Sequence, residues 1–132
     1  MVVFILMSNE LVLICEDDDD LREAVATGLK DAGMEVLTAK NGEEGASLAL
    51  SHQPSLILMD IQMPVMDGHQ AVQKIRADEW GKNAKVIYLT SLSDAENVVY
   101  AVEKGSDDYL VKPHVSLKEL VNKVRLAIHA PD

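Results

Sequence analysis

Cysteine, basic side chains and long hydrophobic runs are all scarce in this sequence, and each shortage excludes a class of protein. Only one cysteine, Cys15, occurs among the 132 residues, so an intramolecular disulfide cannot form. It lies in the apolar run Leu11–Cys15, where a small buried hydrophobe is a better interpretation than a reactive thiol. A chain without disulfides suits the reducing cytoplasm, which is the location we expect.

Basic residues are outnumbered by acidic ones. The chain carries 12 Lys and Arg against 22 Asp and Glu, which gives a formal net charge of -10 and a sequence pI near 4.7. Direct binding to nucleic acids or anionic membranes needs basic patches. The composition therefore argues against both and favours cations or basic protein surfaces as partners.

No apolar run approaches the ~20 residues that a membrane helix needs. The apolar start, Met1–Met7, also lacks the basic residues and small-residue cleavage site of a secretory signal. We therefore expect no membrane insertion. We interpret residues 1–9 as an N-terminal extension in which Met7 is an alternative start, residues 10–130 as one domain, and residues 131–132 as a tail.

Within that domain, short apolar runs alternate with segments of helical periodicity. The runs predict strands at residues 11–15, 34–39, 55–60, 86–90 and 108–111, each followed by a predicted helix. Such alternation is typical of a doubly wound α/β fold, with a five-stranded parallel sheet and helices on both faces. Asp20 and Glu23 predict a capping box at the start of the first helix, and Asp67-Gly68 predicts the start of the third.

The most informative stretch is residues 56–68, an apolar run that ends in Asp60 and then in turn residues. Four apolar residues in a row are typical of a strand covered on both faces. The carboxyl ends of parallel strands meet at one edge of the sheet, where such folds place their working sites. The residues that this edge would bring together are Glu16, Asp17, Asp60, Thr90 and Lys112.

Three carboxylates in one pocket favour a bound cation. Two carboxylates ~4 Å apart repel by ~4 kcal/mol at an effective dielectric near 20. An all-oxygen site open to water suits Mg²⁺, with Mn²⁺ as the alternative ion, and no His or Cys stands nearby to favour zinc. With Lys112 and the Thr90 hydroxyl, the site also suits a phosphoryl group arriving in line at Asp60.

Four segments, in order, resemble the response-regulator receiver (CheY-like) domain of two-component signalling. They are Leu13-Ile14-Cys15-Glu16-Asp17-Asp18, the stretch Met59–Gly68 with the sequence MDIQMPVMDG, Leu89-Thr90-Ser91, and Gly105–Pro113 with the sequence GSDDYLVKP. The likeness covers about residues 10–130. It implies the flavodoxin-like strand order 2-1-3-4-5.

The resemblance also implies roles for individual residues and partners. It makes Asp60 the phosphoacceptor, Glu16 and Asp17 the acidic pair and the Gln62 carbonyl a further Mg²⁺ ligand. It makes Thr90 and Lys112 the phosphoryl contacts, Tyr109 the aromatic switch and Pro113 the site of a cis peptide bond. A sensor histidine kinase or histidine phosphotransfer protein would supply the phosphoryl group. The chain would catalyse only its own phosphorylation and dephosphorylation. Phosphorylation would change its binding to a downstream protein or effector domain. The surface that changes would comprise the helix expected near residues 94–105, the strand at 108–111 and the last helix.

Two other functions are compatible with parts of the pattern. A Mg²⁺-dependent phosphohydrolase acting through an aspartyl phosphate would need a second aspartate two residues after the nucleophile, where Gln62 stands. A flavin binder of the same strand order would need a Gly- and hydroxyl-rich loop after the first strand, where this chain has five acids.

The positions two residues after Asp60 and Thr90 tune hydrolysis in the family, and here they are Gln62 and Leu92. Because Leu92 offers no polar group to orient an attacking water, we predict a long-lived phosphorylated state. A phosphorylation-dependent homodimer is a further expectation. It rests on charges of the last helix and the start of the fifth strand, namely Lys118, Lys123, Arg125, Asp107 and Asp108.

Overall fold

A central parallel sheet organises the part of the chain that the computed structural model describes, which is residues 10–91, 109–111 and 116–129. Its strands lie in the order β2-β1-β3-β4-β5, and every neighbouring pair is parallel. They are β1 (Leu11–Cys15), β2 (Glu35–Ala39), β3 (Leu56–Asp60), β4 (Val86–Thr90) and β5 (Tyr109–Val111). The doubly wound fold and the strand order predicted from the sequence are confirmed.

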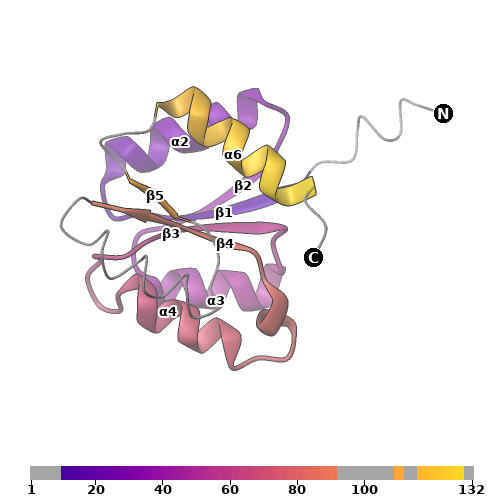
Figure 1. The fold of residues 1–132 in the computed structure, drawn as a ribbon. Helices are drawn as coiled ribbons and strands as arrows, with labels where there is room; N and C mark the ends of the chain where they lie inside the picture. The colour runs from indigo at the N-terminus through magenta and orange to yellow at the C-terminus, as the bar shows by residue number, and fades with distance from the viewer. Residues whose placement is uncertain (1–9, 92–108, 112–115, 130–132) are drawn as a thin grey trace.

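Helices cover both faces of this sheet (Figure 1). One face carries α2 (Asp19–Asp31) and α6 (Leu117–His129), and the opposite face carries α3 (Gly42–His52) and α4 (Gly68–Arg76). A short 3-10 helix, η1 (Trp80–Asn83), leads into β4. The helix expected near residues 94–105 lies outside the described residues. No helix among those described combines the length and apolar character needed to cross a membrane.

The sheet divides the hydrophobic core into two clusters. In β1, Leu13 and Cys15 join the cluster under α3 and α4, whereas Val12 and Ile14 join the cluster under α2 and α6. This division follows from strand geometry, because successive side chains point to opposite faces. All five residues of β3 are buried, as expected for a strand in the middle of a sheet covered on both sides.

The helix caps near the strand ends are partly as predicted. Asp67 begins α4 with a complete capping box, in which its carboxylate accepts from the Gln70 amide and the Gln70 side chain accepts from the Asp67 amide. The capping box predicted for Asp20 and Glu23 is wrong. The residue that caps α2 is Asp18, whose carboxylate accepts hydrogen bonds from backbone amides in the first turn, so the helix begins at Asp19.

Candidate functional site

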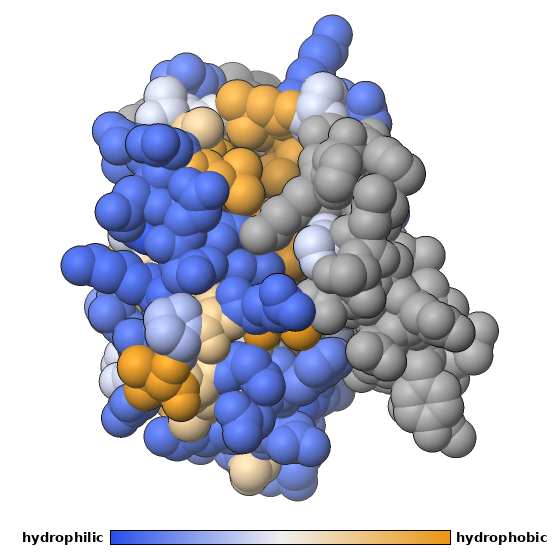
Figure 2. Space-filling model, turned by 90° about the vertical axis from the view of Figure 1, so that its left-hand side faces the viewer, coloured by the Kyte–Doolittle hydropathy of each residue, from blue (hydrophilic) through white to orange (hydrophobic). Residues whose placement is uncertain are grey.

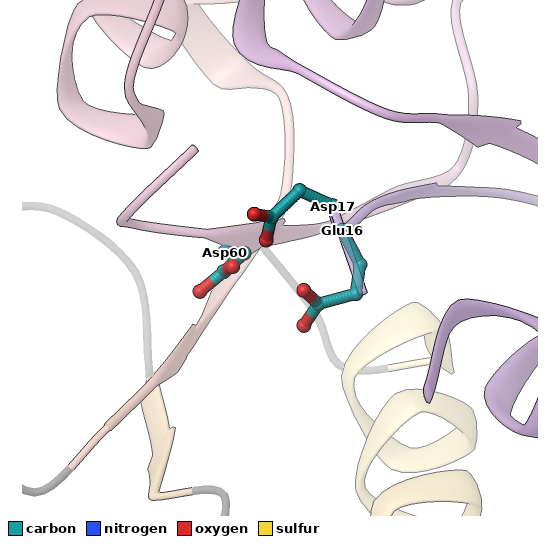
Figure 3. A group of neighbouring side chains, drawn as sticks. All are labelled: Glu16, Asp17 and Asp60. Carbon is teal, nitrogen blue, oxygen red and sulfur yellow. The ribbon is translucent and has the colours of Figure 1, made fainter. Parts of the chain in front are cut away.

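Three carboxylates meet where β1 and β3 end side by side. Cys15 pairs with Met59 in the parallel register, so Glu16 and Asp60 follow at the same level of the sheet. Glu16 and Asp60 are 0% and 4% exposed, whereas Asp17 is exposed. Carboxylate oxygens of all three residues lie within 4.8 Å of one another, and Figure 3 shows them turned toward a common space. The grouping predicted from the sequence is present in the fold.

Backbone hydrogen bonds hold the two buried acids in place. The Ile61 amide donates to Asp60 Oδ1 at 2.9 Å, and the Asp18 amide donates to Glu16 Oε2 at 3.1 Å. The Glu16 amide donates to the Ala39 carbonyl at 3.0 Å and thereby extends the ladder between β1 and β2. Hydrogen bonds of this kind fix the direction in which a carboxylate points.

The loop from β3 to α4 folds back tightly onto the strand end. The Gly68 amide donates to the Ile61 carbonyl at 2.8 Å, and a Cβ at Gly68 would lie 2.1 Å from the Asp60 carbonyl oxygen. Only glycine permits so close an approach. The same loop is hydrogen-bonded to the start of α3, because the Gly42 amide donates to the Met66 carbonyl at 2.9 Å.

Within this loop Val65 has an unfavourable backbone conformation. Its φ is 71°, and the Met66 amide donates to the Pro64 carbonyl across it at 2.7 Å. These two features describe a γ-turn with positive φ, which is rare and strained, the more so for a β-branched residue. Val65 is also 75% exposed. Neither the turn nor the contacts of Gly42 and Gly68 were predicted from the sequence.

Thr90 ends β4 beside the acidic group. Asp60 pairs with Leu89 in the register, so Thr90 stands one residue beyond the level of Asp60. Its side chain is buried, and its hydroxyl donates to the Ser91 carbonyl at 3.1 Å. Gln62 is exposed in the β3–α4 loop. Tyr109 begins β5, where it pairs with Tyr88.

The remaining predicted site residues are not placed by the structure. Leu92, Lys112 and Pro113 lie outside the described residues, as does the side chain of Tyr109. Their roles stay predictions.

The donor set fits a small hard cation. Mg²⁺ takes oxygen ligands at 2.0–2.1 Å, so two ligands of one ion lie up to about 4.2 Å apart. Carboxylate oxygens within 4.8 Å of one another are close to that span, and the exposure of Asp17 leaves room for the waters that Mg²⁺ retains. His and Cys ligands are absent from this group, which separates it from a zinc centre.

Cys15, which precedes Glu16 in the sequence, does not belong to the group of carboxylates. Cys15 is 1% exposed, and burial, reinforced by the nearby negative charge of Glu44, raises the pKa of its thiol far above the ordinary range. Its sulfur packs so closely that a Cβ at Gly45 would lie 2.5 Å from it. The predicted role of Cys15 as a buried hydrophobe is confirmed.

An apolar hollow lies between the first turns of α2 and α6, over Leu89 of β4. It has a volume of about 70 Å³, and Figure 2 shows hydrophobic residues gathered in a hollow beside hydrophilic ones. The residues that line it are Leu21, Ala24, Val25, Leu89, Ser116, Leu117 and Leu120. On α2, the exposed acids Asp20 and Glu23 directly precede the lining residues Leu21 and Ala24 in the sequence.

Comparisons with known proteins agree on one family. A family model described as the response regulator receiver domain matches residues 12–125. The chain is 34% identical over 96% of its length to a probable transcriptional regulator, ycf27, of Porphyridium aerugineum, and 40% identical over 90% of its length to the transcriptional regulatory protein PrrA of Mycobacterium tuberculosis. These matches cover 51% and 50% of the two relatives, so the chain spans about half the length of the curated relatives it matches.

A solved structure supports the same assignment. The crystal structure of a putative response regulator from Chloroflexus aurantiacus superposes with a TM-score of 0.84 at 29% sequence identity. The match covers 93% of this chain and 100% of that one.

Proposed function

The chain belongs to the response-regulator receiver domain family, and from that premise we propose that it is a phosphorylation-dependent signalling switch with Asp60 as its phosphoacceptor. The observation that carries the proposal is the position of Asp60. It is a nearly buried carboxylate at the end of the central strand β3, beside two further carboxylates. A buried acid in such a cluster is costly unless it is paired or takes part in chemistry.

The proposed reaction is a phosphoryl transfer to the Asp60 carboxylate. One oxygen of Asp60 forms a bond to phosphorus while the bond from phosphorus to a histidine nitrogen of the donor breaks, and that nitrogen keeps the electron pair. The Ile61 amide holds the Asp60 carboxylate in direction. Thr90 and Lys112 would contact the phosphoryl oxygens, and Tyr109 would follow the change at Thr90.

Glu16, Asp17 and Asp60, with the Gln62 carbonyl, would hold Mg²⁺ or Mn²⁺ in this site. When bound, the ion supplies positive charge against the phosphoryl oxygens. The fixed side chains of Glu16 and Asp60 and the exposed side chain of Asp17 would provide the oxygen ligands. The chain then acts only on its own phosphorylation and dephosphorylation.

Mass spectrometry of the intact chain tests this proposal. The parent chain is incubated with Mg²⁺ and acetyl phosphate, alongside Asp60→Ala and, as a matched control, Asp20→Asn, which alters an exposed acid outside the cluster. We expect one phosphoryl group on the parent chain and on Asp20→Asn, and none on Asp60→Ala. A phosphoryl group retained by Asp60→Ala would contradict the assignment.

The phosphodonor partner would be a sensor histidine kinase or a histidine phosphotransfer protein. The apolar hollow between α2 and α6, on a chain with a net charge of -10, fits a donor helix that presents apolar residues flanked by basic ones. Ala24→Lys puts a long cationic side chain into the hollow, whereas Thr27→Lys places one elsewhere on the exposed surface of α2.

We expect Ala24→Lys to slow transfer from a histidine kinase that phosphorylates the parent chain, while phosphorylation by acetyl phosphate stays unchanged. Thr27→Lys should leave both reactions unchanged. Equal kinase-dependent rates for all three chains would contradict docking at the hollow.

The output would pass to a downstream protein or effector domain in the cytoplasm. The relatives named above are transcriptional regulators, but the acidic charge of this chain argues against DNA contact by the receiver domain itself. The altered surface would comprise the helix expected near residues 94–105, β5 and α6. Within α6 the Arg125 side chain contacts the Ala32 carbonyl of its own chain at 3.4 Å. Dimerisation through the charges of α6 remains a prediction, since Asp107 and Asp108 lie outside the described residues.

The lifetime of the phosphorylated state would depend on Gln62 and Leu92. Leu92 offers no polar group that would orient a water for attack. We predict that Leu92→Glu or Leu92→Asn accelerates the decay of the phosphorylated chain, measured as loss of the phosphoryl group with time. An unchanged decay rate would contradict this role of Leu92.

A further inference from the structure

Arg22, in the first turn of α2, contacts the backbone of Glu16, a residue of the acidic site. Its guanidinium Nη1 donates to the backbone carbonyl of Glu16 at 2.9 Å. Its other terminal nitrogen, Nη2, is paired with the carboxylate of Asp19. The Arg22 side chain is only 15% exposed, whereas that of Asp19 is 81% exposed. The contact with the Glu16 carbonyl is therefore better shielded from solvent than the pair with Asp19.

The carbonyl that Arg22 contacts belongs to the peptide group between two predicted metal ligands. That peptide group is planar, so the direction of the Glu16 carbonyl also fixes the direction in which Asp17 leaves the strand. Asp17 is exposed, so packing does little to orient it. The Glu16 amide is already tied to β2 through Ala39, and the Arg22 contact ties the other end of the same residue to α2.

We propose that Arg22 is a positioning residue, which holds the Glu16–Asp17 peptide so that both carboxylates face the Mg²⁺ site. This inference rests on the proposed function, because it concerns the same cation site. Residues that orient metal ligands from behind typically change metal affinity about 10- to 100-fold when they are replaced.

Electrostatics alone predicts the opposite sign, which makes the inference testable. Arg22 carries a positive charge beside a cluster that is proposed to bind a cation. If that charge were its only effect, removing it would strengthen Mg²⁺ binding. If Arg22 acts by positioning, removing its donors weakens Mg²⁺ binding although the site becomes more negative.

Arg22→Met is the decisive variant, because it keeps a long apolar stem and loses both the charge and the donors. Arg22→Lys keeps the charge and one donating group, and Asp19→Ala removes the exposed pair while sparing the contact with Glu16. Mg²⁺ affinity is measured by isothermal titration of each folded chain. We expect affinity about tenfold weaker for Arg22→Met, an intermediate value for Arg22→Lys, and less than about a twofold change for Asp19→Ala.

A second measurement, without Mg²⁺, separates positioning from a general loss of helix stability. In amide NMR spectra, Arg22→Met should shift the Asp17 resonance, which reports the Glu16–Asp17 peptide, and Arg22→Lys should shift it less. Mg²⁺ binding by Arg22→Met that is equal to or tighter than that of the parent chain would overturn the inference alone. Failure of the parent chain to bind Mg²⁺ would overturn the cation site and the inference together.

Discussion

Replacing Asp60 by Asn should make the metal-free chain more stable, although it removes the proposed reactive group. Asp60 and Glu16 are both nearly buried, and their carboxylate oxygens lie within 4.8 Å of each other. Two charges at that distance repel by about 3.5 kcal/mol at an effective dielectric of 20. The hydrogen bond from Ile61 and the other contacts of Asp60 offset part of this repulsion. Asn keeps an oxygen that can accept from Ile61, so we expect a net gain of about 1–2 kcal/mol.

Thermal unfolding with and without Mg²⁺ provides the assay. For a chain of this length, a gain of about 1–2 kcal/mol corresponds to a rise in Tm of about 4–8 °C. Mg²⁺ at about 100 times its Kd adds about 2.7 kcal/mol to the parent chain, and less to Asp60→Asn. The order of the two chains should therefore reverse when Mg²⁺ is added.

Glu35→Gln is the matched control for that experiment, because it removes one negative charge from an exposed residue of β2 outside the cluster. It should leave Tm nearly unchanged in both buffers. A folded Asp60→Asn chain with the Tm of the parent chain or lower in metal-free buffer would refute the reasoning. So would an order of stabilities that Mg²⁺ does not change.

Three further predictions concern stability. Burial raises the pKa of the Cys15 thiol above its unfolded value of about 8.5, so the free energy of unfolding of the parent chain should fall as the pH rises above that value. The fall should exceed that of Cys15→Ala by up to about 1.4 kcal/mol per pH unit, measured by urea titrations at about pH 8 and about pH 10. An equal fall in the two chains would contradict this prediction. Val65→Asn should raise the free energy of unfolding by about 1 kcal/mol, because Asn tolerates positive φ and the side chain is exposed. Val65→Ala, which lacks the polar side chain that lets Asn adopt positive φ, should gain less. Gly68→Ala should lower the free energy of unfolding by about 3 kcal/mol or more, since the new Cβ would lie 2.1 Å from the Asp60 carbonyl oxygen. The control Gly28→Ala places its Cβ against only the flexible side chain of Leu117, so its free energy of unfolding should be nearly unchanged.

Regular patterns in the sequence predicted the scaffold well. The runs at residues 11–15 and 86–90 form β1 and β4 without any shift of boundary, because a continuous apolar run between turn residues has few alternatives in an α/β chain. The start of α4 was equally clear, since Asp67-Gly68 is a turn pair and aspartate is a favoured helix cap.

The acidic run after β1 shows where local patterns stop being sufficient. Asp18, Asp19 and Asp20 are all acceptable caps by residue type, and the presence of Glu23 favoured Asp20. The structure uses Asp18 because Glu16 is held to β2 by its backbone, which fixes where the chain turns into the helix. That constraint comes from a different strand and is not visible in the local sequence.

The cluster of Glu16, Asp17 and Asp60 was predicted because strand ends converge by topology. The supports of that cluster were not predicted. Arg22 reaches a backbone carbonyl, and Gly42 offers a backbone amide to another loop. A contact to a backbone group does not depend on the residue type of the partner, so such contacts cannot be predicted from the sequence alone.

The two-sided core has a consequence for how this domain tolerates sequence change. Ala71 and Ile75 of α4 and Val25 and Leu29 of α2 belong to different clusters, separated by the sheet. Substitutions that share no partners combine additively. Epistasis should therefore be strong within each cluster and weak between them, so combinatorial libraries built separately on the α2 and α4 sides can be merged without screening the cross terms.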